Sequence, residues 1–98
     1  MDFECTGAIW EWRGPAPFHF VTVPTELCDD LRVQANLATY GWGVVPVTAE
    51  SSGVAFTTSL FPRDGGYVIP IKAAVRQVLR VGIGDEVTVS FTVAFPQP

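Results

Sequence analysis

A charged, glycine-rich loop and the helix predicted after it hold the residues best suited to chemistry. Residues 63–66 read Arg-Asp-Gly-Gly, and Lys72 and Arg76 follow at the spacing that places both on one side of a helix. Cations beside glycine amides suit a small anion or a carboxylate. Trp42 stands between two glycines and is expected to be exposed. We therefore predict a site for an anionic ligand with four lining residues: Trp42, Arg63, Lys72 and Arg76.

The simpler interpretation of the same residues is structural. The Arg-Asp-Gly-Gly loop would then be a solvated turn, and the cations that follow would only complement the helix dipole. The carboxylates offer an enzymatic alternative, because Asp64 or Asp85 could act as a general acid or base if a pocket buries it.

Histidine and cysteine are too few for most catalytic relays or metal sites. His19 is the single histidine, so a Ser-His-Asp or Cys-His relay would have to use it. Its spacing from Cys5 and Cys28 is not that of structural zinc sites. We therefore expect no metal and no cofactor, a strand histidine at a sheet edge, and two reduced cysteines, of which Cys28 is buried by a helix.

Length and charge limit the class of protein. The 98 residues suit one domain, residues 1–98, with one hydrophobic core. No apolar run approaches the length of a membrane span, and the first residues lack the basic start of a secretory signal, so we expect a cytoplasmic protein without a membrane partner. The net charge of −4 argues against binding to nucleic-acid phosphates. A monomer and a homodimer are both compatible with the sequence.

Apolar and polar residues alternate with the period of a β-strand over much of the chain, most regularly in residues 86–95. Gly7 is expected to carry a bulge, Pro46 to mark an edge or a bulge, and residues 61–66 to form a loop. The predicted strands are residues 3–12, 18–23, 44–48, 54–60, 67–69 and 86–95.

Two short helices are predicted at residues 26–35 and 72–80, each after a strand that ends in proline. In the second helix Val75, Val78 and Leu79 form the apolar side. So many strands in so short a chain favour a sheet that curls on itself around one core. The predicted fold class is mainly β: a small six- to seven-stranded β-barrel, closed or partly open, with two short α-helices.

Three stretches carry a resemblance to a known family. They are Ser-Leu-Phe-Pro-Arg-Asp-Gly-Gly at 59–66, Lys-Ala-Ala-Val-Arg at 72–76 and Gly-Asp-Glu-Val-Thr-Val at 84–89. The chain resembles the bacterial domain-of-unknown-function family DUF1905 over nearly its whole length. The resemblance implies a compact β-barrel with short helices, and it supplies no catalytic residues. Val-Gly-Ile at 81–83 departs from the Gly-Leu usual in the family.

These observations favour a non-catalytic binding module for a small anionic ligand or for an acidic segment of a protein partner. The alternatives are the small enzyme built on Asp64 or Asp85 and a DNA-binding domain, because residues 69–89 also resemble the repeating unit of swapped-hairpin DNA-binding dimers. Only Lys72, Arg76 and Arg80, with Arg63 as a further contributor, could form the basic face of such a domain, which makes nucleic acid the weakest of the three.

Overall fold

The computed structural model describes residues 2–15, 17–38 and 43–94. They form seven strands and two helices, which confirms the mainly β fold class. In chain order the elements are β1 (Asp2–Ala8), β2 (Trp10–Trp12), β3 (Phe18–Thr22), α1 (Thr25–Ala38), β4 (Val45–Ser51), β5 (Val54–Arg63), β6 (Gly66–Pro70), α2 (Ala73–Leu79) and β7 (Glu86–Val93).

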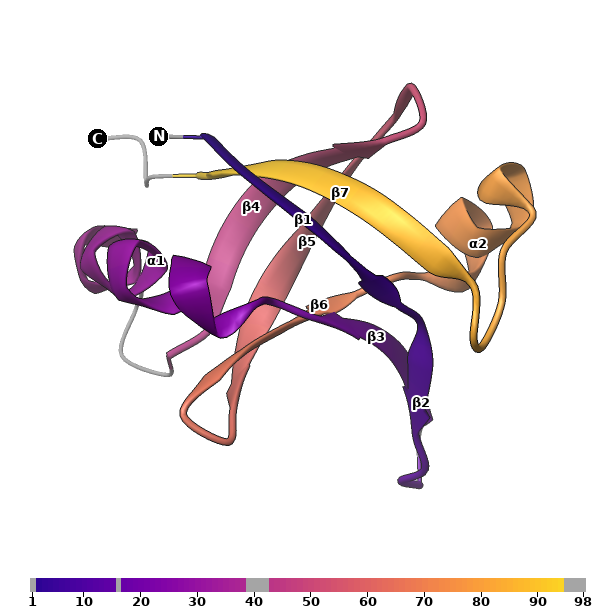
Figure 1. The fold of residues 1–98 in the computed structure, drawn as a ribbon, viewed down its shortest axis with the longest axis horizontal. Coiled ribbons are helices and arrows are strands. Elements are labelled where there is room, and N and C mark those ends of the chain that lie inside the picture. Colours follow the sequence, from indigo (N-terminus) through magenta and orange to yellow (C-terminus); the bar gives the residue numbers. More distant parts are fainter. Residues whose placement is uncertain (1, 16, 39–42, 95–98) are drawn as a thin grey trace.

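The strands form one antiparallel sheet that curls into a half-barrel (Figure 1). Its order is β1-β7-β4-β5-β6-β3-β2, so the two edge strands, β1 and β2, are consecutive in the chain and only Ile9 separates them. Ile9 is buried, donates its N–H to the carbonyl of Asp85 over 2.9 Å and accepts the N–H of Gly84 over 2.8 Å. One bent segment therefore supplies both edges of the sheet, and the partly open form of the predicted barrel is correct.

Gly7 does not carry the predicted bulge. It pairs with Val87 within an unbroken ladder between β1 and β7, and the interruption falls at Ile9 instead. The glycine serves close approach, because a Cβ at Gly7 would lie 3.2 Å from Cγ1 of Val21 in β3. The missing side chain therefore lets β1 approach β3, where the two sides of the curled sheet meet.

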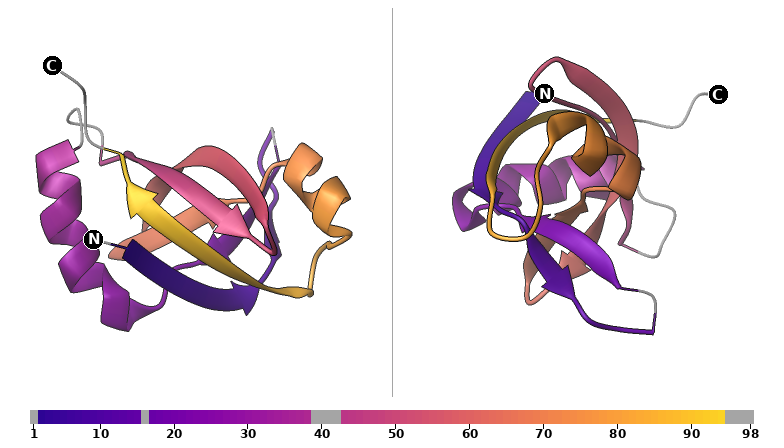
Figure 2. Two further views of the ribbon diagram at one scale, coloured as in Figure 1. Left: turned by 90° about the horizontal axis from the view of Figure 1, so that it is seen from above. Right: turned by 90° about the vertical axis from the view of Figure 1, so that its right-hand side faces the viewer.

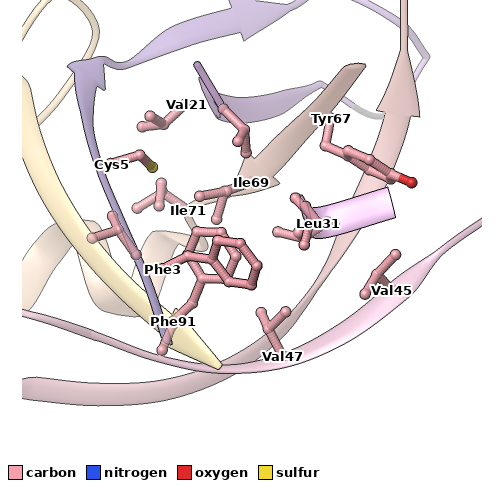
Figure 3. Packing of buried hydrophobic residues seen from close by; sticks show 14 of the residues in the cluster. Phe3, Cys5, Val21, Leu31, Val45, Val47, Tyr67, Ile69, Ile71 and Phe91 are labelled. Carbon is pink, nitrogen blue, oxygen red and sulfur yellow. The ribbon is translucent and has the colours of Figure 1, made fainter. Parts of the chain in front are cut away.

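Period-two alternation along the strands fills the inside of the half-barrel. In β7 the period-two pattern predicted over residues 86–95 is confirmed as far as Val93, since Val87, Val89, Phe91 and Val93 are buried and most residues between them are exposed. Phe95 lies outside the described residues. Phe3 lies opposite Phe91 across the β1–β7 ladder, and their rings stack with centroids 5.3 Å apart (Figure 3). One apolar interior therefore joins the first and last strands.

The helices lie at opposite ends of the half-barrel (Figure 2). α1 extends three residues beyond the predicted range of 26–35 and directs Leu31 into the core beside Tyr67 (Figure 3). In α2, Val75 is buried and Leu79 packs against the core, whereas Val78 is 65% exposed. The prediction for Val78 is wrong because a helix that caps the end of a barrel contacts it along one narrow stripe, which residues 75 and 79 already occupy.

Two tight turns fix the register of the β4–β5–β6 meander. Ser52 and Gly53 have φ of 49° and 81°, and Asp64 and Gly65 have φ of 51° and 80°. Positive φ at both central positions is what a type I′ hairpin requires, and Asp-Gly is a favoured pair there. The predicted loop over residues 61–66 is therefore wrong: its first half extends β5, and only the two central residues turn.

Substitution at the centre of this core tests the packing. Leu60 is fully buried, so Leu60→Ala is expected to lower the free energy of unfolding by about 3 kcal/mol, through lost transfer energy and a residual cavity. Val78→Ala removes a side chain that is already exposed to water, so the free energy of unfolding should change by less than about 0.5 kcal/mol. Urea denaturation followed by circular dichroism measures both; equal effects would contradict the described core.

Candidate functional site

β5 and β6 run side by side only near their turn. Their pairing consists of Phe61↔Val68, Pro62↔Tyr67 and Arg63↔Gly66. Residues of β6 bond alternately to β5 and to β3, and the next one due to bond to β5 is Pro70, which has no N–H. Beyond Val68, β6 stays with β3, where Phe20 lies opposite Pro70 and Ile71 donates its N–H to the carbonyl of His19 over 2.8 Å. The sheet is therefore split between β5 and the end of β6.

The backbone of β5 faces this split. Ala94 donates its N–H to the carbonyl of Pro46 over 2.9 Å, so residue 46 directs its backbone carbonyl toward β7. Its cross-strand partner Ser59 therefore directs its own N–H and C=O away from β4 and into the split, and Thr57 does the same two residues earlier. The contact of 3.4 Å between Lys72 Nζ and the carbonyl of Thr57 agrees with this orientation.

A groove of about 750 Å³ occupies the split, and we call it the β5–β6 groove. The volume lies within the range of small-molecule sites, roughly 300–1,000 Å³. Its ionisable side chains are His19, Lys72 and Arg76, and no Asp or Glu of the described residues lines it. On its two walls stand Thr57, Thr58 and Ser59 from β5, and Pro70, Ile71 and Lys72 from the end of β6 and the start of α2.

Two of the four predicted site residues meet in this groove. Lys72 is the residue that precedes the first turn of α2, and Arg76 follows one turn later, as their spacing predicts. Arg76 is half-buried and donates its Nε–H to the carbonyl of Ile71 over 3.0 Å. This bond orients the guanidinium, and no described protein group accepts a hydrogen bond from its two Nη atoms.

His19 is the third ionisable residue that lines the groove, and the sequence interpretation did not place it in the site. It lies in β3 between β2 and β6, so the predicted sheet-edge position is wrong. Its side chain is 16% exposed, and its Nε2 lies 3.9 Å from a carboxylate oxygen of Glu11, its cross-strand partner. In the sequence His19 stands between two phenylalanines, which gave no indication of a binding site. Its place in the groove depends on the separation of β5 from the end of β6, which the sequence alone does not show.

Arg63 lies away from the groove. Its guanidinium stacks 5.1 Å above the ring of Trp10, and its Nε lies 3.7 Å from the Asp64 carboxylate. It lines a separate hollow of about 340 Å³, where Arg32 of α1 donates to the carbonyl of Gly65 over 2.6 Å. The structure thus attaches the β5–β6 turn to α1 and does not bring Arg63 together with the other two cations. Trp42, the fourth predicted residue, lies outside the described residues.

An aromatic cluster covers the outer face of the sheet beside the groove. Trp12 is 36% exposed and Phe18 is 43% exposed. Two members, Phe18 and Phe61, also line the β5–β6 groove. The sequence does indicate this cluster, because aromatic residues repeat with period two in both β2 and β3, which places them on one face of that hairpin. The outer aromatic cluster comprises Trp10, Trp12, Phe18, Phe20 and Phe61.

The carboxylates of the enzymatic alternative are in solvent or in a turn. The side chain of Asp64 is 91% exposed, and the exposed Asp85 accepts the N–H of Gly82 over 2.8 Å, which is the local backbone bond expected for a turn. Among the described residues no three His, Cys, Asp or Glu side chains converge to hold a metal ion. The described helices include none that is long and apolar enough to cross a membrane.

The fold and groove define a small half-barrel domain with a cation-lined opening in its wall. The family model of DUF1905, a domain of unknown function, matches residues 6–91, so the chain belongs to this family. No curated protein matches the sequence. The family resemblance seen in the sequence is therefore confirmed.

Both cysteines are free and buried; burial was predicted for Cys28 only, and Cys5 gives the fold a dependence on pH. Burial, with a smaller contribution from the Glu4 carboxylate, raises the pKa of Cys5 from 9.0 to about 11. The unfolded chain releases this proton near pH 9 and the folded chain near pH 11. Stability should therefore fall as the pH rises between these values, by roughly 2–3 kcal/mol in total.

The matched variant Cys5→Ala lacks this titration. Urea denaturation under reducing conditions from pH 8 to pH 11 should show a steeper loss of stability in the natural chain than in Cys5→Ala. Equal slopes would mean that the thiol titrates alike in the folded and unfolded states.

Proposed function

We propose that this domain is a non-catalytic binding module whose β5–β6 groove holds an anionic ligand. The observation that carries the proposal is the charge of the groove. Lys72, Arg76 and His19 line it without a described carboxylate, although the chain has ten acidic residues and only six Lys and Arg. Hydrogen bonds from the Lys72 ammonium and the Arg76 guanidinium to an anion are roughly twice as strong as those between neutral groups.

The other walls of the groove favour a ligand with an apolar part. Phe18, Phe61 and Pro70 present apolar surface, and threonine and serine residues of β4 and β5 also line the groove. A few polar groups within a largely apolar lining are typical of sites that orient a small molecule. We therefore place the charged end of the ligand near α2 and its apolar part against the two phenylalanines.

The location and the solvent exposure of the candidate catalytic carboxylates support binding over catalysis. Asp64 and Asp85 lie outside the β5–β6 groove, and the side chain of Asp64 is almost fully solvated. General acid–base catalysis needs a carboxylate whose surroundings shift its proton affinity, and exposure does not provide that. The nearest ionic partner of His19 is Glu11, and no described serine or cysteine forms a hydrogen bond with it.

Neutral substitutions in the groove test the proposal. Calorimetric titration with acetate, succinate, citrate and inorganic phosphate should find at least one anion that binds. Lys72→Gln and Arg76→Gln should each weaken that binding by about tenfold, since each removes a charge-assisted contact. Native mass spectrometry of the purified chain should detect any ligand that remains bound.

Arg80→Gln is the charge-matched control. Arg80 ends the same helix on its C-terminal side and does not line the β5–β6 groove, so its loss changes net charge equally and should leave affinity within about twofold. The proposal fails if no anion binds, or if all three variants weaken binding alike, because the effect would then be one of overall charge.

A further inference from the structure

We infer that the occupant of the β5–β6 groove is an extended peptide that adds a strand to β5 and carries a carboxylate to Lys72 and Arg76. The inference rests on the proposed function, since it names the class of ligand that the same groove binds. Strand addition to an exposed sheet edge is a common mode of peptide recognition, in which backbone hydrogen bonds provide affinity and side-chain pockets provide specificity.

The backbone of β5 provides the edge. Ser59 and Thr57 direct their N–H and C=O groups into the split, and neither has a partner in the β5–β6 register, which ends at Phe61↔Val68. Lys72 contacts the carbonyl of Thr57 at a weak 3.4 Å, so an incoming carboxylate could take over the ammonium group and free that carbonyl for the peptide. A row of donors and acceptors that a sheet leaves open is complementary to an extended chain.

Proline keeps this edge open. Pro70 cannot donate to β5, so β6 does not close onto Ser59. Pro46 lies opposite Ser59 in β4 at a pair that is not hydrogen-bonded, so β4 takes up neither backbone group of Ser59. The edge is therefore unpaired because Pro70 in the neighbouring strand has no N–H, and an outside strand has no native strand to displace.

The groove also fits the two sides of a strand. Side chains of an added strand point alternately outward and inward, so those on one side reach the same surface. On the outer side, Phe18 and Phe61 border the groove next to the two cations of α2. A peptide with an acidic group and an apolar residue on one side of the strand, two or four positions apart, matches this surface.

A selection from random heptapeptides on the immobilised full chain tests the inference. Enriched peptides should carry an acidic side chain or need a free C-terminal carboxylate, and synthesis of each with a free and an amidated C-terminus distinguishes the two sources. Ser59→Pro removes the N–H that faces the split, and Ser59→Ala removes only the hydroxyl. Peptide affinity should fall at least about tenfold in Ser59→Pro and by less than about twofold in Ser59→Ala.

An independent measurement uses the peptide and needs no variant to fold. N-methylation of each peptide amide in turn should abolish binding at every second position, because only alternate residues of an added strand bond to β5. The inference is overturned if no peptide is enriched, if methylation shows no such alternation, or if a correctly folded Ser59→Pro binds as tightly as Ser59→Ala.

Titration with small anions distinguishes failure of the strand-addition inference from failure of the proposed anion site. If peptides fail while succinate or phosphate still binds in a manner that depends on Lys72 and Arg76, the strand-addition inference is wrong and the proposed anion site stands. If neither peptides nor small anions show that dependence, both are wrong.

Discussion

The missing N–H of Pro70 is the constraint on which the described groove depends. It ends the β5–β6 ladder after Phe61↔Val68 and leaves the next stretch of β5 without a neighbour on that side. The chain departs from the sheet at the same place and begins α2, which brings Lys72 and Arg76 to the opening. One residue thus opens the wall and also positions the charges beside it, so the groove follows from the fold without any insertion or long loop.

The half-barrel has apolar residues on both of its faces over part of the sheet. Phe20 and Val68 are buried although they lie outside the main core, because the outer aromatic cluster covers them. Arg63 completes this layer by stacking on Trp10, and Arg32 holds the adjoining turn to α1. Arg63, one of the four residues predicted to bind an anion, therefore contacts Trp10 and does not line the groove with Lys72 and Arg76.

The parts of the fold that the sequence predicted are those governed by local patterns. The alternation in β7 leaves one choice of inward face, and the spacing of Lys72 and Arg76 places them on one side of any helix. The extension of β5 was missed because Pro62 looks like a strand breaker, yet it occupies a position whose N–H the ladder does not use. The groove and its histidine could not be predicted, because they depend on which distant strands are neighbours.

The pairing of β1 with β7 has a consequence for how the domain assembles. The meander of β4, β5 and β6 is held by two tight turns, whereas Phe3 and Phe91 must find each other across almost the whole chain. Closing so long a loop costs more chain entropy than forming a hairpin, so this seam is expected to form late and to open early. Detachment of the first strand would uncover Phe3 and the thiol of Cys5 together, which makes that sulfur a built-in reporter of local opening.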